Sequence, residues 1–205
     1  MTQIPGVILA GGLARRMGGG DKCLLQLGGK TILNRVVGRF SSQVGAVAIN
    51  ANGDPKRFSE YGLQVIGDTF TGHAGPLAGV LSAMEWAAQL GADQVATVAA
   101  DTPFFPDDLV PVLAQTLASG GDISLAATLD KKRGEMRHPT FGLWPVDFRE
   151  DLRRALEDGT RKVVVWTDRH DTKSALFASA NRDPFFNINT EQDLQDAQAM
   201  LASQS

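Results

Sequence analysis

A glycine-rich run that also carries three cations follows the first apolar segment of the chain. Residues 9–22 read LAGGLARRMGGGDK, and residues 6–9 read GVIL. Glycines let backbone N–H groups approach a phosphate closely, while Arg16 and Lys22 place positive charge beside it. The run therefore predicts a nucleotide-binding loop after a strand. The alternative is a flexible glycine loop with solvated arginines.

Two common phosphate-binding motifs do not fit this part of the chain. The dinucleotide motif GxGxxG fails because Cys23 stands where its last glycine belongs. The P-loop motif GxxxxGK[ST] matches residues 29–31, which read GKT, but Leu24 replaces its first glycine. We expect the Gly28–Gly29 pair to form a turn before a helix, with Lys30 in solvent.

Polar residues close three further apolar runs. Asp101 follows the nearly continuous apolar residues 94–100, and a carboxylate there suits Mg²⁺, which combines one or two carboxylates with substrate phosphates and waters. A turn or N-cap aspartate would give the same pattern. Asn50 and Asp68 also end predicted strands, where each could contact a nucleotide or bond only to the local backbone.

Three more segments could contact phosphates of a nucleotide or of an acceptor. Gly75 opens the sequence GPLAG, and a helix N-terminus there would favour phosphate, although glycine and proline also simply begin helices. Arg137 and His138 end a basic stretch that either holds an anionic phosphate or forms a solvated loop. Asn187 and Asn189 alternate onto one face of an extended segment.

Composition narrows the class of protein. A chain of 205 residues predicts one domain over residues 1–205, with a nucleotide-binding part over about 1–105 and an acceptor-binding part over about 106–205. A net charge of −3 argues against a nucleic-acid partner. One cysteine cannot form an internal disulfide, no apolar run approaches the roughly 20 residues that span a bilayer, and residues 4–10 do not resemble a signal peptide. We therefore expect a cytoplasmic protein without a membrane partner.

Short apolar runs alternate with amphipathic ones, which predicts a mostly parallel α/β sheet with helices on both faces. After residue 130 the order is less regular, and residues 162–166 and 174–178 are ambiguous. The predicted strands are Gly6–Ala10, Ala46–Asn50, Gln64–Gly67, Val95–Ala100 and Ile123–Ala127. The predicted helices are Ile32–Ser42, Pro76–Leu90, Pro106–Leu117, Val146–Glu157 and a last helix capped at Thr190 that reaches about Leu201.

The pattern LAGGxxxRMGxxDK over residues 9–22 resembles the signature of nucleotidyltransferases that activate a small phosphorylated acceptor with a nucleoside triphosphate. The GPLAG segment and Asn187-Ile188-Asn189 add to this resemblance. Within these nucleotidyltransferases the chain is most similar to the molybdenum cofactor guanylyltransferases, from Val7 to about Leu201. Cys23 departs from the glycine that is common in that family.

The resemblance implies a three-layer α/β/α Rossmann-like nucleotidyltransferase fold and transfer of GMP from GTP to the terminal phosphate of molybdopterin, with release of pyrophosphate. It implies Mg²⁺ as cofactor, held by Asp101, and transient contacts with a molybdenum-insertion protein and with molybdoenzyme chaperones. The implied catalytic residues are Arg16, Lys22 and Asp101. The implied nucleotide-binding residues are Leu9, Ala10, Gly11, Gly12, Lys22, Asn50, Asp68, Gly75 and Asp101, and acceptor binding is assigned to Arg137, His138, Asn187 and Asn189.

Two kinds of alternative remain at this point. A cytidylyltransferase of the same cofactor or a sugar-phosphate nucleotidyltransferase would share the loop, although the cytidylyl enzymes usually carry LAAG where residues 9–12 read LAGG. A non-catalytic carrier of molybdopterin or nucleotide would bind the same ligands, but it would not need the metal carboxylate predicted at Asp101.

Overall fold

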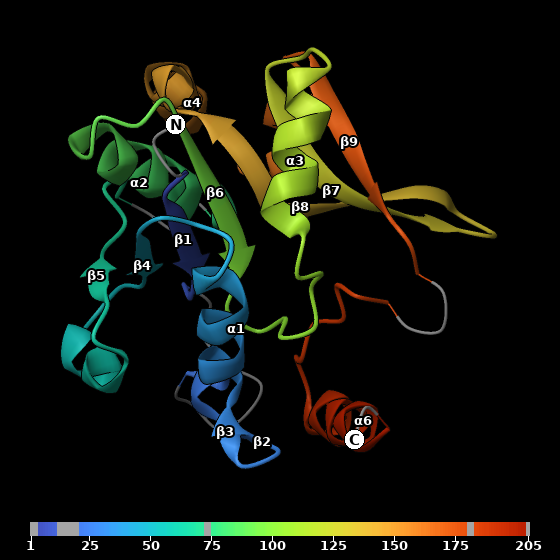
Figure 1. Cartoon of the computed structure of the whole chain (residues 1–205). Helices are drawn as coiled ribbons and strands as arrows, with labels where there is room; N and C mark the ends of the chain where they lie inside the picture. The colour runs from blue at the N-terminus through green and yellow to red at the C-terminus, as the bar shows by residue number, and fades with distance from the viewer. Residues whose placement is uncertain (1–3, 12–20, 72–74, 180–182, 204–205) are drawn as a thin grey trace.

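The computed structural model describes residues 4–11, 21–71, 75–179 and 183–203 (Figure 1). Its main sheet has seven strands in the order β5-β4-β1-β6-β8-β7-β9. Neighbouring strands are parallel except that β8 runs antiparallel to both β6 and β7. The strands are β1 (Gly6–Leu9), β4 (Val47–Asn50), β5 (Gln64–Ile66), β6 (Gln94–Ala99), β7 (Ile123–Asp130), β8 (Gly134–Pro145) and β9 (Thr172–Phe177).

Helices connect and cover these strands. The α-helices are α1 (Ile32–Ser41), α2 (Pro76–Gln89), α3 (Leu109–Ala118), α4 (Arg149–Glu157), α5 (Val163–Thr167) and α6 (Glu191–Ala202). The short elements are the 3₁₀ turns η1 (Lys22–Leu24), η2 (Pro55–Tyr61) and η3 (Val146–Phe148), and a two-stranded hairpin of β2 (Gln26–Leu27) and β3 (Lys30–Thr31).

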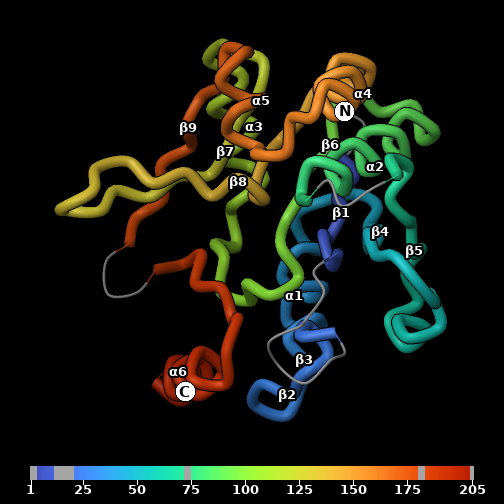
Figure 2. Tube along the Cα trace, turned by 180° about the vertical axis from the view of Figure 1, so that it is seen from behind, coloured from blue at the N-terminus to red at the C-terminus, as the bar shows by residue number. Residues whose placement is uncertain are grey.

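The sheet is buried on both faces, as the continuous apolar runs predict for parallel strands. On β1, Val7 belongs to the buried cluster that includes side chains of α2, α4 and α5. Ile8 belongs to the cluster that includes side chains of α1 and α3, and neither side chain is exposed to solvent. Figure 2 shows α6 lying apart from the sheet, near β2 and β3. The predicted three-layer α/β/α class is confirmed.

Most local predictions hold. Gly28 and Gly29 form the expected turn with positive φ angles of 56° and 77°, Lys30 is exposed, and Pro76 occupies the first turn of α2. A capping box between Thr190 and Asp193 begins α6. The third helix begins at Leu109 rather than at Pro106, because residues 103–108 form turns before it.

The basic stretch from residue 131 differs from the prediction, because most of it is a strand. β7 continues to Asp130, whose carboxylate accepts hydrogen bonds from the backbone N–H groups of Lys132 and Arg133 at 2.8 Å each. This Asx-type turn, followed by Gly134 at a φ of 77°, reverses the chain into β8. The two segments left ambiguous become α5 and β9.

The parallel arrangement brings the carboxyl ends of four strands to one edge of the sheet. Backbone hydrogen bonds tie these ends together: the Ala10 N–H donates to the Asn50 carbonyl at 2.8 Å, and the Ala100 N–H donates to the Leu9 carbonyl at 3.1 Å. The residues that follow β1, β4, β5 and β6 therefore share one edge, where open α/β sheets bind ligands. No helix in the described ranges is both long and apolar enough to cross a bilayer.

Candidate active site

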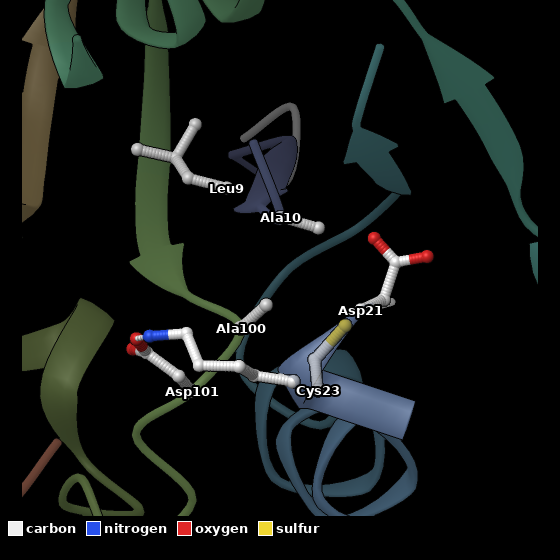
Figure 3. Close-up of a pocket in the computed structure, with 7 residues that line it drawn as sticks. Leu9, Ala10, Asp21, Cys23, Ala100 and Asp101 are labelled. Carbon is white, nitrogen blue, oxygen red and sulfur yellow. Dashed lines mark hydrogen bonds and ion pairs between the residues drawn. The ribbon is translucent and has the colours of Figure 1, made fainter. Parts of the chain in front are cut away.

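A cleft opens at the carboxyl edge of the sheet and takes residues from both halves of the chain. It encloses about 610 Å³, part of it open to solvent, and a smaller hollow beside it shares Leu9 and Asp101 with it (Figure 3). The cleft is lined by Leu9, Gly11, Asn50, Asp68, Gly75, Pro76, Gly79, Ala99, Asp101, Thr140 and Asn187. The smaller hollow is lined by Leu9, Ala10, Asp21, Lys22, Cys23, Ala100 and Asp101.

The Lys22 ammonium joins two oxygen groups that are distant in sequence. Its Nζ atom lies 3.5 Å from Asp101 Oδ2 and donates a hydrogen bond to Asn189 Oδ1 at 2.7 Å. Lys22 is the first residue of η1, and Asp101 follows β6. We call Lys22, Asp101 and Asn189 the ammonium end of the site. It places one positive charge beside one carboxylate at the carboxyl end of β6.

The segment with Asn187 and Asn189 is fixed against the loop after β6. The Ile188 N–H donates to the Asp101 backbone carbonyl at 3.0 Å, and the Ile188 side chain is fully buried. Asn187 lines the cleft and contacts the Thr102 hydroxyl. The two amides flank a buried side chain, in agreement with the alternation expected of an extended segment.

A second polar group, which we call the amide end, surrounds Asp68. Asn50 Nδ2 donates to Asp68 Oδ1 at 3.0 Å, and Asn52 Nδ2 donates to Asp68 Oδ2 at 2.7 Å. The Asp68 N–H returns a bond to Asn52 Oδ1 at 2.8 Å. Both carboxylate oxygens are thus oriented by amide donors while Asp68 lines the cleft.

Two glycines let α2 begin close to this amide end. A Cβ atom on Gly79 would stand 2.6 Å from Asn50 Oδ1 and 3.0 Å from Leu9 Cδ2, so no larger side chain fits without movement. Gly75 precedes α2 with φ 66° and ψ −158°, a conformation that only glycine adopts easily. The N-terminus of α2, whose first N–H groups have no partner within the helix, therefore borders the cleft.

Arg137 and His138 are adjacent in sequence, but they point to opposite faces of β8. Arg137 Nη1 pairs with Asp168 at 2.8 Å, and its Nε lies 3.3 Å from Ser174 Oγ. His138 stacks on Phe185 with ring centroids 4.2 Å apart, and burial lowers the pKa of its imidazole. The structure therefore does not bring these two side chains together, since successive residues of a strand face opposite sides.

The remaining predicted residues fall into two groups. Leu9, Ala10 and Gly11 lie at the edge of the sheet between the two ends of the site, whereas Gly12 and Arg16 lie outside the described residues.

Cys23 is buried, and desolvation raises the pKa of its thiol to about 12, with further contributions from the charges of Asp21 and Asp101. Its thiol therefore serves as a packed apolar group.

Three side chains in contact with the site were not predicted. Asn52 orients Asp68, Thr102 contacts Asp101 and Asn187, and Arg57 pairs with Asp21 at 3.2 Å while donating to the Asn52 carbonyl. Arg57 thus links the loop before Lys22 to the amide end. The sequence gives no signal for Arg57, because its role depends on where η2 lies against the loop.

The oxygen groups near Asp101 fit a hard divalent cation. No cluster of three His, Cys, Asp or Glu side chains that could hold a metal ion occurs within the described part of the chain. Mg²⁺ typically needs only one or two carboxylates, with substrate phosphates and waters completing its shell. The Asp101 carboxylate and the Asn187 amide, both facing the cleft, are suitable oxygen donors.

The fold and the site define a class of protein. A mostly parallel sheet with a lysine-bearing loop after β1 and a carboxylate after β6 is the arrangement of an α/β nucleotidyltransferase. Two solved structures share the fold. Molybdopterin-guanine dinucleotide biosynthesis protein A from Archaeoglobus fulgidus matches with a TM-score of 0.77 and 23% identity, over 98% of this chain and all of that chain. The 4-diphosphocytidyl-2C-methyl-D-erythritol synthase from Anaerococcus prevotii matches with a TM-score of 0.75 and 14% identity, over 98% of this chain and 96% of that chain.

Sequence comparison assigns the family. The chain belongs to the MobA-like NTP transferase domain family, which matches residues 6–173. It is 47% identical over 205 residues to the molybdenum cofactor guanylyltransferase of Bradyrhizobium sp. (strain ORS 278), covering 98% of this chain and 94% of that protein. The molybdenum cofactor guanylyltransferase of Mesorhizobium japonicum is 46% identical, with 98% and 97% covered. The resemblance inferred from residues 9–22 is confirmed.

Proposed function

We propose that this protein transfers GMP from GTP to the terminal phosphate of molybdopterin, forming a guanine dinucleotide and releasing pyrophosphate. Relatives that share 46–47% of residues over nearly the whole chain carry the name molybdenum cofactor guanylyltransferase. The observation that carries the mechanism is the ammonium end, where Lys22 lies between Asp101 and Asn189 beside the cleft.

The reaction needs positioning and charge neutralisation more than proton transfer. An oxygen of the acceptor phosphate attacks the α-phosphorus of GTP, the bond to the β-phosphate oxygen breaks, and pyrophosphate leaves. The attacking oxygen is already an anion near neutral pH, so no strong general base is required. Lys22 stabilises the negative charge that develops on pyrophosphate, and Arg16 is proposed to share this role. The backbone N–H groups of Gly11 and Gly12, which follow the paired residues of β1, and those of the α2 N-terminus are proposed to bind phosphate oxygens.

The proposed cofactor is Mg²⁺, for which Asp101 and Asn187 would supply oxygen ligands. When bound, the cation neutralises charge on the phosphate groups of the nucleotide. Asp101 itself is held in place by the backbone bond from Ile188 and by the side chain of Thr102, so its carboxylate is oriented before substrate arrives.

The amide end is proposed to select the base. Asp68 offers carboxylate oxygens only, which accept hydrogen bonds, and guanine presents adjacent N–H donors on one edge. Asn50 and Gly75 complete this side of the cleft. Asn187 and Asn189 border the acceptor, and we keep Arg137 and His138 as proposed acceptor contacts from the two faces of β8. Transient contacts with a molybdenum-insertion protein and molybdoenzyme chaperones, and a cytoplasmic location, belong to the same proposal.

The decisive assay measures pyrophosphate release with Mg²⁺, molybdopterin and each of the four nucleoside triphosphates in turn. We expect release with GTP that depends on the acceptor. A preference for CTP would keep the mechanism and overturn the proposed base. Tight binding of GTP and molybdopterin without any pyrophosphate would contradict the enzymatic assignment and favour a carrier.

A further inference from the structure

The Thr102 hydroxyl lies buried between two groups of the active site. Its Oγ1 atom is 3.2 Å from Asp101 Oδ1 and forms a short contact with Asn187 Oδ1, and the residue has no exposed surface. Asn187 is 85 residues further along the chain. Thr102 therefore connects the loop after β6 with the segment that precedes α6.

The Thr102 hydroxyl has one hydrogen for two neighbouring side-chain oxygens. A hydroxyl has one hydrogen, so it cannot donate to the Asp101 carboxylate and to the Asn187 carbonyl oxygen at the same time. The ionised carboxylate has no hydrogen to offer in return. If the Asn187 amide is turned so that its NH₂ group faces Thr102, each contact gains a hydrogen: Asn187 donates to Thr102, and Thr102 donates to Asp101.

This orientation has a consequence for the cleft. Asn187 lines the cleft, and turning its NH₂ group toward Thr102 directs Oδ1 away from the hydroxyl. The amide oxygen then becomes available to a cation or to a protonated acceptor group. The same chain of bonds directs the Thr102 hydroxyl hydrogen to the Asp101 carboxylate.

We infer that Thr102 is a positioning residue that holds Asn187 and Asp101 in one unit, so that the segment 186–189 completes the active site. The expected effect on kcat rests on the proposed function, whereas the expected effect on the segment 186–189 does not. Two further bonds act across the same junction, from the Ile188 N–H to the Asp101 carbonyl and from Lys22 to Asn189. The Thr102 hydroxyl differs from these two links because it contacts the side chains of both Asp101 and Asn187.

The test compares Thr102→Val, which keeps the shape and removes the hydroxyl, with Thr102→Ser, which restores the hydroxyl. Thr167→Val is the matched control, because Thr167 is also fully buried but lies on α5 and bonds to a backbone carbonyl of that helix. Thr102→Ala replaces the valine variant if circular dichroism shows that the latter does not fold.

The first readout is hydrogen–deuterium exchange over residues 186–189 without substrate. Loss of one hydrogen bond corresponds to exchange faster by about fivefold, which we expect for Thr102→Val and not for Thr102→Ser or Thr167→Val. The second readout is turnover: kcat should fall by about tenfold or more in Thr102→Val while the KM for GTP changes by less than about twofold, and Thr102→Ser should restore kcat.

The two readouts separate failure of this inference from failure of the proposed function. If the wild-type protein releases no pyrophosphate but Thr102→Val still exchanges faster over residues 186–189, the proposed function is wrong and the positioning role stands. Exchange and kcat in Thr102→Val that match Thr167→Val would overturn the inference, because the threonine would then only fill space.

Discussion

The two ends of the cleft are assembled across very different distances along the chain. At the amide end, Asn50 and Asn52 hold Asp68 across 18 and 16 residues. At the ammonium end, Lys22 joins Asp101 and Asn189 across 79 and 167 residues. The amide end is thus formed by two adjacent parallel strands, whereas the ammonium end needs the first loop, the sheet centre and the C-terminal segment together.

In the proposed function, this difference separates nucleotide binding from nucleotidyl transfer. The amide end lies beside the paired strands β4 and β5 and makes its hydrogen bonds without residues 186–189. The ammonium end forms only when residues 186–189 lie against the loop after β6. We therefore expect substitutions at the amide end to alter nucleotide affinity and choice, and those at the ammonium end to alter kcat.

The largest expected effect is that of Lys22→Met. This change removes the charge that contacts Asp101 and Asn189 while keeping a long side chain. We expect kcat to fall by about 10²–10³-fold, the usual cost of losing one group that stabilises transition-state charge. Lys30→Met is the control, because Lys30 is exposed on β3 outside the cleft. Equal losses in the two variants would contradict a specific role for Lys22.

A steric change at the amide end should alter affinity instead. In Gly79→Ala the new Cβ would meet Asn50 Oδ1 at 2.6 Å, and overpacking of this kind costs about 1–3 kcal/mol. We expect GTP to bind about tenfold more weakly, measured by equilibrium titration. Gly38→Ala is the matched helical control, since nothing lies within 4 Å of its Cβ position, and it should stabilise the protein by about 0.5–1 kcal/mol.

A smaller effect should follow from Asn52→Ala, which removes one of the two amide donors on Asp68. One hydrogen bond contributes about 1 kcal/mol, so we expect GTP affinity to fall about fivefold and the preference for GTP over CTP to narrow. Competition between the two nucleotides measures this directly, with the exposed Asn34→Ala on α1 as control. An unchanged preference would show that Asp68 does not read the base through this geometry.

The smallest effect concerns the pH dependence of stability. Burial lowers the pKa of His138 below its usual value of 6.5, so the unfolded state binds the proton more readily than the folded state. The contribution of the neutral imidazole is therefore present above pH 6.5 and is lost as the pH falls below that value. His138→Gln should reduce this loss, as measured by urea unfolding at about pH 7.5 and about pH 5.5. If His138→Gln lost as much unfolding free energy between about pH 7.5 and about pH 5.5 as the wild type does, this role of His138 would be contradicted.

The sequence predicts which residues lie at the two ends better than it predicts the contacts between them, for a physical reason. Asn50, Asp68 and Asp101 could be located because each follows an apolar strand, and parallel strands end at one edge. The sequence does not show that Asn52, rather than water, orients Asp68, because this contact depends on the register of β4 and β5. The contacts of Lys22 with Asn189 and of Thr102 with Asn187 depend on non-local docking, which no local pattern encodes.

The region after residue 130 shows where local patterns mislead. Arg137 and His138 look like part of a basic loop, yet pairing with β7 and β6 turns residues 134–145 into a strand and separates the two side chains. Residues 163–167, which read VVVWT, favour a strand by propensity. They form α5 because Val163 and Trp166 are buried together with α2 and α4, so tertiary packing outweighs the local preference.

The central claim is that the ammonium end performs nucleotidyl transfer on a nucleotide bound independently of it. The most direct test measures GTP affinity in EDTA and pyrophosphate release in Mg²⁺ for Asp101→Asn, whose side chain keeps the shape and loses the charge. We predict affinity within about threefold of the wild type and turnover lower by about 10²–10³-fold, as for Lys22→Met. Turnover within about tenfold of the wild type would contradict the account.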